Sequence, residues 1–150
     1  MEVLFNLCLP HDEASVPVVR HLVSSALTRL GVDEACISDV LVAVTEACTN
    51  VLKHANGSGH EYEVKVGVFP DLCEMRVTDL GAGLAPGALE RVPAGVEDES
   101  GRGVQLMRSL VDQLQFVAGP RAGLSVRLSK RLSFRDGAIM QRLAGASHAH

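Results

Sequence analysis

The sequence predicts a two-layer α/β sandwich, in which a mixed, mostly antiparallel sheet carries its helices on one face. Segments with the two-residue alternation of strands are separated by segments with the 3.6-residue period of helices. These strands come in runs and do not alternate one for one with helices, which disfavours a doubly wound parallel sheet. The chain has 150 residues, of which 47% are apolar, and this is enough to form the core of one domain.

The first third of the chain is predicted to form a strand and two helices. Residues 3–9 alternate loosely and stop at Pro10. Ser15 is expected to cap the first helix, with Pro17 in its first turn and Gly31 as the left-handed residue that ends it. A second helix runs from a cap at Asp33 to about residue 55. Its predicted core stripe is Ile37, Leu41, Val44, Cys48, Val51 and Leu52.

The remaining elements are a hairpin, a long loop, a helix and a second hairpin. Residues 62–68 and 73–77 alternate around the turn at Pro70-Asp71. Residues 84–100 are rich in Pro, Gly, Ala and acidic residues, which is typical of a mobile, functional loop. A third helix is expected from Gly103 to Leu114, and two strands around 115–118 and 124–132. We therefore predict one domain over residues 1–132 and a frayed tail over 133–150.

Charge and composition narrow the classes of function. The net charge is −4 and the pI is near 5.8, with no cluster of Lys and Arg, so a nucleic-acid partner is not expected. Apolar runs such as residues 40–44 are too short to span a bilayer, and we expect a soluble, cytoplasmic protein. The four cysteines lack zinc-site spacing and are expected to be reduced core thiols, with a Cys8–Cys73 bridge as the alternative.

Polar side chains follow one face of the second predicted helix. Asp39, Glu46, Asn50 and Lys53 are separated by seven, four and three residues, so they share a face opposite the core stripe. An ordinary solvated face is the simpler interpretation, but Asn is a mediocre helix former. Its amide oxygen suits Mg²⁺, Glu46 one turn earlier could accept a proton, and Lys53 could reach a phosphate.

Two glycine-containing segments complete a candidate nucleotide site. Asp79-Leu80-Gly81-Ala82-Gly83 ends a strand, where a carboxylate could accept from an adenine amine while the glycines leave room for the ring. Gly101-Arg102-Gly103 opens a helix whose free N–H groups could bind phosphate. Ser125, which follows Gly123, is a further polar candidate. Each segment alone is equally well explained as a turn, and neither is a phosphate loop or a dinucleotide motif.

In order, these segments resemble the N box and glycine boxes of the histidine-kinase-like ATPase superfamily. The matching segments are Glu46-Ala47-Cys48-Thr49-Asn50-Val51-Leu52-Lys53-His54, Asp79 to Leu84, Gly101 to Val104 and Gly123-Leu124-Ser125. The resemblance covers about residues 3–132 and implies the Bergerat type of sandwich. Within the superfamily, the E-A-x-T-N helix is similar to that of bacterial anti-sigma factor serine kinases.

The resemblance implies roles for individual residues. Asn50 matches the Mg²⁺ ligand, Glu46 the general base, and Asp79 the carboxylate that reads adenine beside Gly81 and Gly83. The phosphates are expected near Gly101, Arg102, Gly103, Lys53 and His54, and Ser125 is expected to support the adenine site. Leu124 departs from the family pattern, because a Thr commonly follows the last glycine, and Val104-Gln105 replaces a bulkier apolar start of the lid helix.

The implied function is an ATP- and Mg²⁺-dependent serine/threonine-protein kinase that acts as an anti-sigma factor. Its implied partners are a sigma factor and a small anti-anti-sigma protein of the STAS type, and members of the family commonly form homodimers. The alternative is a non-catalytic interaction module that uses nucleotide structurally or not at all. The ATPase half of a histidine kinase is disfavoured, because the Glu and Pro expected after a phosphoacceptor histidine do not follow His21.

Overall fold

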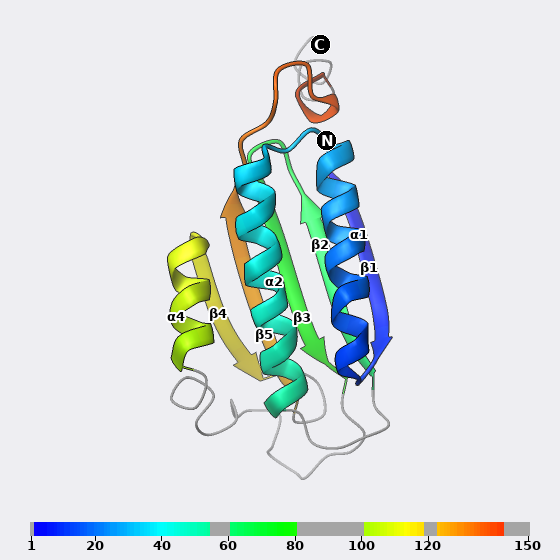
Figure 1. The fold of residues 1–150 in the computed structure, drawn as a ribbon, viewed down its shortest axis with the longest axis vertical. Coiled ribbons are helices and arrows are strands. Elements are labelled where there is room, and N and C mark those ends of the chain that lie inside the picture. Colours follow the sequence, from blue (N-terminus) through cyan, green and yellow to red (C-terminus); the bar gives the residue numbers. More distant parts are fainter. Residues whose placement is uncertain (1, 55–60, 81–100, 119–122, 143–150) are drawn as a thin grey trace.

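One antiparallel sheet carries three helices on one of its faces (Figure 1). The structure is a computed structural model, which describes residues 2–54, 61–80, 101–118 and 123–142. The elements in chain order are β1 (Val3–Pro10), the 3-10 turn η1 (Glu13–Ser15), α1 (Val16–Arg29), α2 (Glu34–His54), β2 (Glu61–Val68), β3 (Leu72–Asp79), α4 (Gly101–Leu110), β4 (Gln113–Ala118) and β5 (Leu124–Arg131).

The strand order is β1-β2-β3-β5-β4, and each neighbouring pair is antiparallel. The last hairpin therefore adds to the sheet through its second strand, so that β5 lies beside β3. This arrangement confirms the predicted two-layer class with helices on one face. The mixed sheet allowed by the sequence is fully antiparallel in the described part of the chain.

The core lies between the sheet and the helices, with α2 at its centre. The α2 residues Val40, Val44 and Cys48 are fully buried, and apolar residues of β2, β3 and β5 face them from the sheet. The buried stripe is wider than predicted, and it includes Ala43 and Ala47, because α1 and α4 flank α2 on both sides. By length and mean hydropathy alone, α2 would also suit a membrane span, but here it is the core helix of the sandwich.

The start of α1 differs from the prediction in its cap. Ser15 stands at the N-cap position, but its side chain makes no capping hydrogen bond. Its hydroxyl instead donates to the carbonyl of Asp12 (2.5 Å) and bonds to the hydroxyl of buried Tyr62. The other end of α1 agrees with the prediction, since Gly31 follows it with a φ of +86°.

The third helix is shorter than its apolar pattern suggested. α4 ends at Leu110, and Leu114, expected to continue the helix, lies in β4. Leu114 pairs with Leu128 of β5, so the sheet sets its conformation in place of the helical period. Sheet pairing between distant residues has overridden a local signal here.

The tail predicted from residue 133 packs on the domain over residues 133–142. Phe134 forms a β-bridge with Val32, and the Arg135 N–H donates to the carbonyl of Gly31 (2.7 Å). Ala138 is 7% exposed and Met140 is 0% exposed. The packed domain therefore continues about ten residues beyond the predicted boundary, and of the predicted tail only residues 143–150 lie outside the described ranges.

All four cysteines are free. Cys48 and Cys73 are buried as predicted, whereas Cys8 is exposed and Cys36 is partly exposed. The alternative bridge between Cys8 and Cys73 is absent, because β2 separates their strands and the two residues pair with opposite ends of it, at Glu63 and Val68.

Candidate functional site

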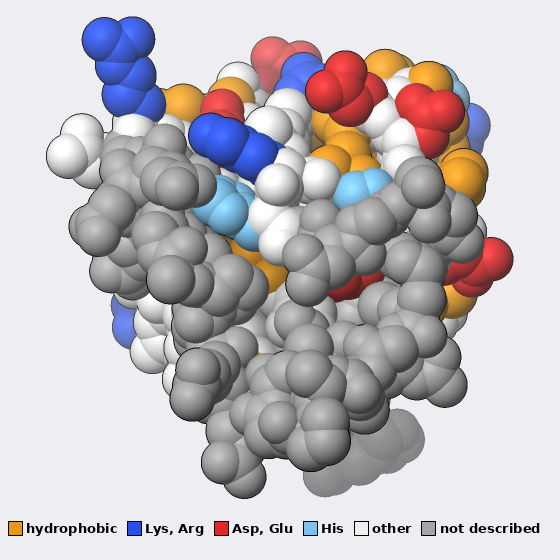
Figure 2. Space-filling model, turned by 90° about the horizontal axis from the view of Figure 1, so that it is seen from below, with side chains coloured by type: hydrophobic (Ala, Val, Ile, Leu, Met, Phe, Trp, Pro, Cys, Tyr) orange, Lys and Arg blue, Asp and Glu red, His pale blue; other side chains and the backbone are white. Residues whose placement is uncertain are grey.

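The predicted site residues gather at one end of the sandwich. The C-terminal end of α2, the end of β3 and the start of β5 meet there, and α4 begins beside them (Figure 1). Figure 2 views the molecule from this end and shows histidine and acidic side chains on it. The antiparallel order brings together segments that are far apart in the chain, as a split nucleotide site requires.

Glu46 of α2 lies against the first turn of α4. A methyl group placed on Gly103 would stand 2.6 Å from Glu46 Oε2, so only glycine leaves this carboxylate its position. Glu46 is partly exposed. The structure thus joins the proposed base of the first box to a glycine of the third box. The sequence contains no direct signal of this contact, because the two residues are on different helices.

Asn50 lies one turn after Glu46 and is unusual for a polar residue because it is only 3% exposed. Its amide nitrogen Nδ2 is buried and, among the described residues, has no hydrogen-bond partner. Buried polar atoms are rarely left unpaired in folded proteins. The amide nitrogen can therefore donate a hydrogen bond to a polar group that does not belong to the described residues.

The neighbouring polar residues of α2 have different environments. Lys53 is exposed and His54 is partly exposed, and both lie in the last turn. Asp39, at the other end of the predicted polar row, instead pairs with Lys130 of β5, with Nζ 3.3 Å from Oδ2. The row is thus divided between an ion pair that joins α2 to the sheet and a group of residues at the site.

Asp79 ends β3 and is 2% exposed, which is rare for a carboxylate. Gly123 lies directly against it. A methyl group on Gly123 would stand 2.7 Å from the Asp79 carbonyl oxygen and 2.8 Å from its Oδ2. β5 therefore approaches the end of β3 closely only because residue 123 has no side chain.

Ser125 is placed differently from the prediction. It pairs with Thr78 in the sheet register, and the two hydroxyls lie 2.9 Å apart. Side chains alternate between the two faces of a strand, so Thr78 and Ser125 share the face opposite to that of Asp79. The residue of β5 on the Asp79 face is Leu124, which is fully buried. The Ser125 hydroxyl bonds to Thr78 beside the end of β3, on the opposite face from the Asp79 carboxylate.

The other predicted residues are at the start of α4 or outside the described ranges. Gly101 begins α4, and Arg102 is exposed in its first turn. The first N–H groups of a helix have no partner within the helix and attract anions. Gly81 and Gly83 lie outside the described residues.

A small polar cluster that sequence reasoning missed lies beneath Asn50 and Asp79. Tyr62, which pairs with Asp79 in the sheet, is fully buried and bonds through its hydroxyl to Ser15. Burial raises the pKa of Tyr62 to about 12, and burial likewise raises the pKa of the neighbouring Cys48 thiol to about 12. Both groups are therefore neutral at physiological pH. The alternation of β2 predicted that Tyr62 is buried, but only the fold shows which residues surround it.

The arrangement has the chemistry of a nucleotide site. It combines a buried carboxylate, a buried amide nitrogen that has no partner among the described residues, a partly exposed carboxylate and a helix N-terminus. Asp79 offers a hydrogen-bond acceptor for a nucleobase, and Asn50 offers a polar group for a metal ion with its phosphates. Glu46 offers a proton acceptor.

Comparisons with known proteins agree with the architecture. The sequence model for the histidine kinase-like ATPase domain matches residues 9–130. The serine-protein kinase RsbW of Bacillus velezensis is 31% identical over 135 residues, or 83% of each chain. The serine-protein kinase RsbW of Bacillus licheniformis is 32% identical over 146 residues, covering 88% of this chain and 89% of that relative.

A solved structure has the same fold. The structure of the RsbU and RsbW domains of Rv1364c from Mycobacterium tuberculosis superposes with a TM-score of 0.65 at 20% identity. The superposition covers 88% of this chain, which spans only 32% of that longer one. The chain belongs to the histidine-kinase-like ATPase superfamily, in the group that contains the serine-protein kinases RsbW.

Proposed function

We propose that this protein binds Mg-ATP at the Glu46–Asn50–Asp79 end of the sandwich and phosphorylates a serine of a partner protein. The observation that carries the proposal is the pair of close contacts at this end. Gly103 lies against the carboxylate of Glu46, and Gly123 lies against Asp79. Gly103 leaves space beside Glu46, which is the proposed proton acceptor. Gly123 leaves space beside Asp79, which is the proposed acceptor for adenine.

The residues fit both the nucleotide and the metal. The buried carboxylate of Asp79 is an acceptor for the exocyclic amine of adenine. Asn50 has a hard amide oxygen for Mg²⁺, and its buried Nδ2 is left to donate to a phosphate or to a metal-bound water. Mg²⁺ held there by Asn50 would supply positive charge to neutralise the negative charge that develops during transfer. Lys53, His54, Arg102 and the N–H groups that open α4 are the proposed phosphate contacts, with Gly101 beside them. Gly81 and Gly83 are proposed to lie beside the adenine ring with Asp79.

Glu46 is the proposed general base. Its carboxylate would take the proton of the attacking serine hydroxyl while the serine oxygen bonds to the γ-phosphorus and ADP leaves. The partly exposed position of Glu46 suits this role, because the incoming serine belongs to another protein and must reach the carboxylate from solvent. Phosphoryl transfer depends mostly on positioning, and α2 holds Glu46 and Asn50 one helical turn apart.

The proposal extends to regulation of transcription. The relatives named above are serine-protein kinases RsbW. We infer that this chain likewise acts in the cytoplasm as an anti-sigma factor, which holds a sigma factor and phosphorylates a small anti-anti-sigma protein of the STAS type. Homodimer formation belongs to the same proposal.

A phosphotransfer assay on the full chain tests the catalytic part. With labelled ATP, Mg²⁺ and a candidate antagonist, Glu46→Gln should reduce phosphoserine formation by at least roughly 100-fold. The affinity for ATP should change little, because the charge removed is not a ligand of the nucleotide. Glu34→Gln, the same change at the exposed start of α2, is the matched control and should transfer normally. Equal transfer rates in the wild type and Glu46→Gln would refute the assignment of the base.

The second candidate function is a non-catalytic interaction module. Buried Leu124, on the face of Asp79, favours it, because this position has no hydroxyl to support an adenine. Calorimetry with Mg-ATP separates the kinase from a module that works without nucleotide. The kinase requires binding that is lost in Asp79→Asn, whereas a module that works without nucleotide shows no heat of binding while it still holds its sigma factor.

A further inference from the structure

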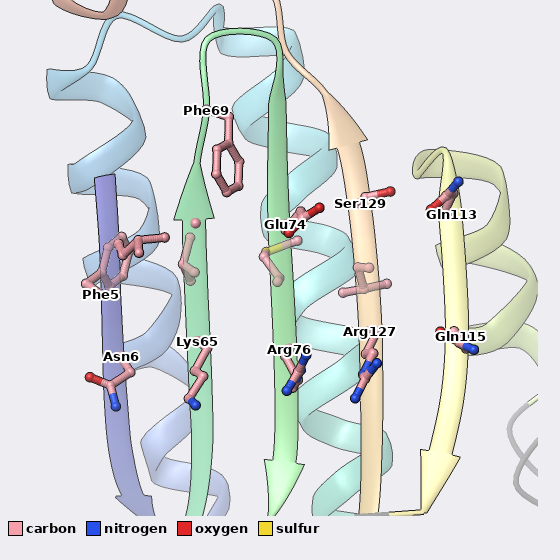
Figure 3. A pocket seen from close by; sticks show the side chains of 15 residues that line it. Phe5, Asn6, Lys65, Phe69, Glu74, Arg76, Gln113, Gln115, Arg127 and Ser129 are labelled. Atoms are coloured by element: carbon pink, nitrogen blue, oxygen red, sulfur yellow. The ribbon is translucent and has the colours of Figure 1, made fainter. Parts of the chain in front are cut away.

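The open face of the sheet, which the helices do not cover, carries a row of cationic side chains. In the register Lys65 lies opposite Arg76, and Arg76 lies opposite Arg127. Asn6 and Gln115 continue the row onto the two edge strands. Figure 3 shows these five side chains in line across the sheet. Three positive charges thus occupy consecutive strands.

This row is unfavourable in the isolated protein. Like charges directly opposite each other on neighbouring strands repel and destabilise a sheet. The positive charge of Lys65 is partly offset by the carboxylate of Glu63, because Lys65 Nζ lies 3.6 Å from Glu63 Oε1. Arg76 and Arg127 are exposed, and within the described ranges neither has a hydrogen-bond or ion-pair partner. The two guanidinium groups are therefore available to an external anionic group.

The row crosses a groove of about 660 Å³. At one end of the groove Leu4 and Phe69 lie over Gly67, 3.0 Å and 3.1 Å from the position that a Cβ would take there. Leu4 is 64% exposed, which is high for a large apolar side chain. One carboxylate, that of Glu74, also lines the groove. The surface therefore combines a cationic row with an exposed apolar end.

We propose that this groove docks an amphipathic helix of a partner protein through an acidic face. Neighbouring strands are about 4.8 Å apart. Acidic residues three or four positions apart on a helix are about 5–6 Å apart. A helix lying across the strands can therefore place one carboxylate over each of Lys65, Arg76 and Arg127. An apolar residue of the same helix would then cover Leu4 and Phe69.

Charge favours this occupant over two others. A second copy of the chain would bring the same cationic groove near itself, which adds repulsion. A nucleic acid needs a longer basic footprint, because three cations on adjacent strands span only about 10 Å, and the whole chain carries a net charge of −4. The groove lies on the opposite face from Asp79, so the proposal does not depend on the nucleotide chemistry.

The test uses the full chain and a designed helical peptide. The peptide carries three Glu residues along one face, a Leu one turn away and one Trp. Because the protein contains no Trp, the peptide emission reports binding without background. We expect saturable binding that weakens with added salt and becomes roughly tenfold weaker in Arg76→Gln/Arg127→Gln. Arg29→Gln/Arg142→Gln removes two exposed arginines elsewhere and should bind the peptide like the wild type.

Urea denaturation of the double variant separates docking from a structural role. If the row exists for docking, Arg76→Gln/Arg127→Gln unfolds at a higher urea concentration than the wild type, because a repulsion is removed. Unchanged peptide affinity in that variant would overturn the proposal, and so would equal binding of a peptide with Gln at the three Glu positions. Tighter binding of a single-stranded oligonucleotide, or a dimer that the double variant loses, would assign the groove to another occupant.

Discussion

Gly123 shows how one missing side chain fixes the distance between two strand ends. The residue directly precedes β5, and its α-carbon faces the backbone and the carboxylate of Asp79. A carbonyl oxygen and a carboxylate at 2.7 Å and 2.8 Å from a new methyl group cannot both be relieved by rotating one side chain. The backbone of β3 or β5 would have to shift.

Gly123→Ala should therefore lower the affinity for ATP by at least about tenfold, with a loss of roughly 1–3 kcal/mol of unfolding free energy. Calorimetry with Mg-ATP and urea denaturation measure the two effects. Gly137→Ala is the control, because Gly137 has a φ of +76° but nothing within 4 Å of its added methyl group. That variant should lose some stability through backbone strain and keep its ATP affinity. Normal ATP affinity in Gly123→Ala would contradict the role given to this contact.

The buried thiols of Cys48 and Cys73 make stability depend on alkaline pH. Burial raises the pKa of each thiol to about 12 from a reference of 9.0. Both thiols keep their protons in the folded state when the unfolded chain has begun to lose its own. The contribution of the two protonated thiols to the free energy of unfolding is therefore complete below pH 9. It is lost as the pH rises from 9 toward 12, by up to about 1.4 kcal/mol per pH unit for each thiol.

Urea denaturation between pH 8 and 10.5 measures this slope, followed by circular dichroism. Cys73→Ala should be less stable at every pH because it leaves a cavity, but its stability should fall less steeply above pH 9. Cys8→Ala should retain the slope of the wild type, since Cys8 is exposed. An identical slope in wild type and Cys73→Ala would show that other groups cause the alkaline loss.

At the level of elements, the contact between α2 and α4 links the two halves of the proposed site. Glu46 belongs to a helix that is built into the core, whereas α4 packs beside it with Val104 and Met107 buried. Gly103 is the point at which the first turn of α4 comes closest to the Glu46 carboxylate. A small side chain at position 103 would therefore shift the carboxylate of Glu46, the proposed base, without changing the packing of the core.

Gly103→Ala should separate catalysis from stability. Alanine favours a helix over glycine by about 0.5–1 kcal/mol, so the melting temperature should stay the same or rise. The new methyl group would displace the Glu46 carboxylate, and phosphotransfer should fall by at least about tenfold. Ser109→Ala, near the other end of α4, is the matched control and should change neither property by much. A fully active Gly103→Ala would show that Glu46 can leave this contact without consequence.

At the level of the whole molecule, residues 133–142 close the end opposite the proposed site (Figure 1). Gly31 permits this closure, since a side chain there would stand 2.4 Å from the Cβ of Ala138. Met140 is fully buried beyond this contact. The segment is part of the fold and is remote from Glu46, Asn50 and Asp79.

Met140→Ala should reduce the free energy of unfolding by about 2–4 kcal/mol, because it removes a buried side chain. ATP affinity should stay within about twofold of the wild type at temperatures where the variant is folded. Ile139→Ala, a change of similar size at a residue that is 40% exposed, should cost well under half as much. Denaturation curves for both variants check the difference, and equal losses would mean that the segment is not packed as described.

The sequence predicted the elements because each has a local signal. The alternation of Tyr62, Val64 and Val66 and the glycine at position 31 depend only on neighbouring residues, and the structure agrees with both. The pairing of β5 with β3 has no local signal, so the face on which Ser125 lies could not be known. Met140 was missed for a similar reason, since it is buried in a segment that the Phe134–Val32 bridge joins to the domain and has no periodic pattern of its own.

The candidate site divides in the same way. The spacing of Glu46 and Asn50 on one helix placed both residues correctly relative to each other, because a helix has a fixed period. The contacts of Gly103 with Glu46 and of Gly123 with Asp79 join separate elements, and no pattern in either segment reports them. The burial of Asn50 is likewise a property of the folded chain that the helical spacing alone does not report.

The pairing of β3 with β5 also determines when a newly made chain acquires its site. Thr78 and Ser125, which bond across this pair, are 47 positions apart in the chain. On the ribosome, Asp79 emerges long before the strand that completes its surroundings, and closing so long a loop is slow compared with forming a helix or a hairpin. An unfinished chain thus has Glu46, Asn50 and Asp79 but no Gly123 beside them. The proposed site is therefore incomplete until synthesis has passed β5.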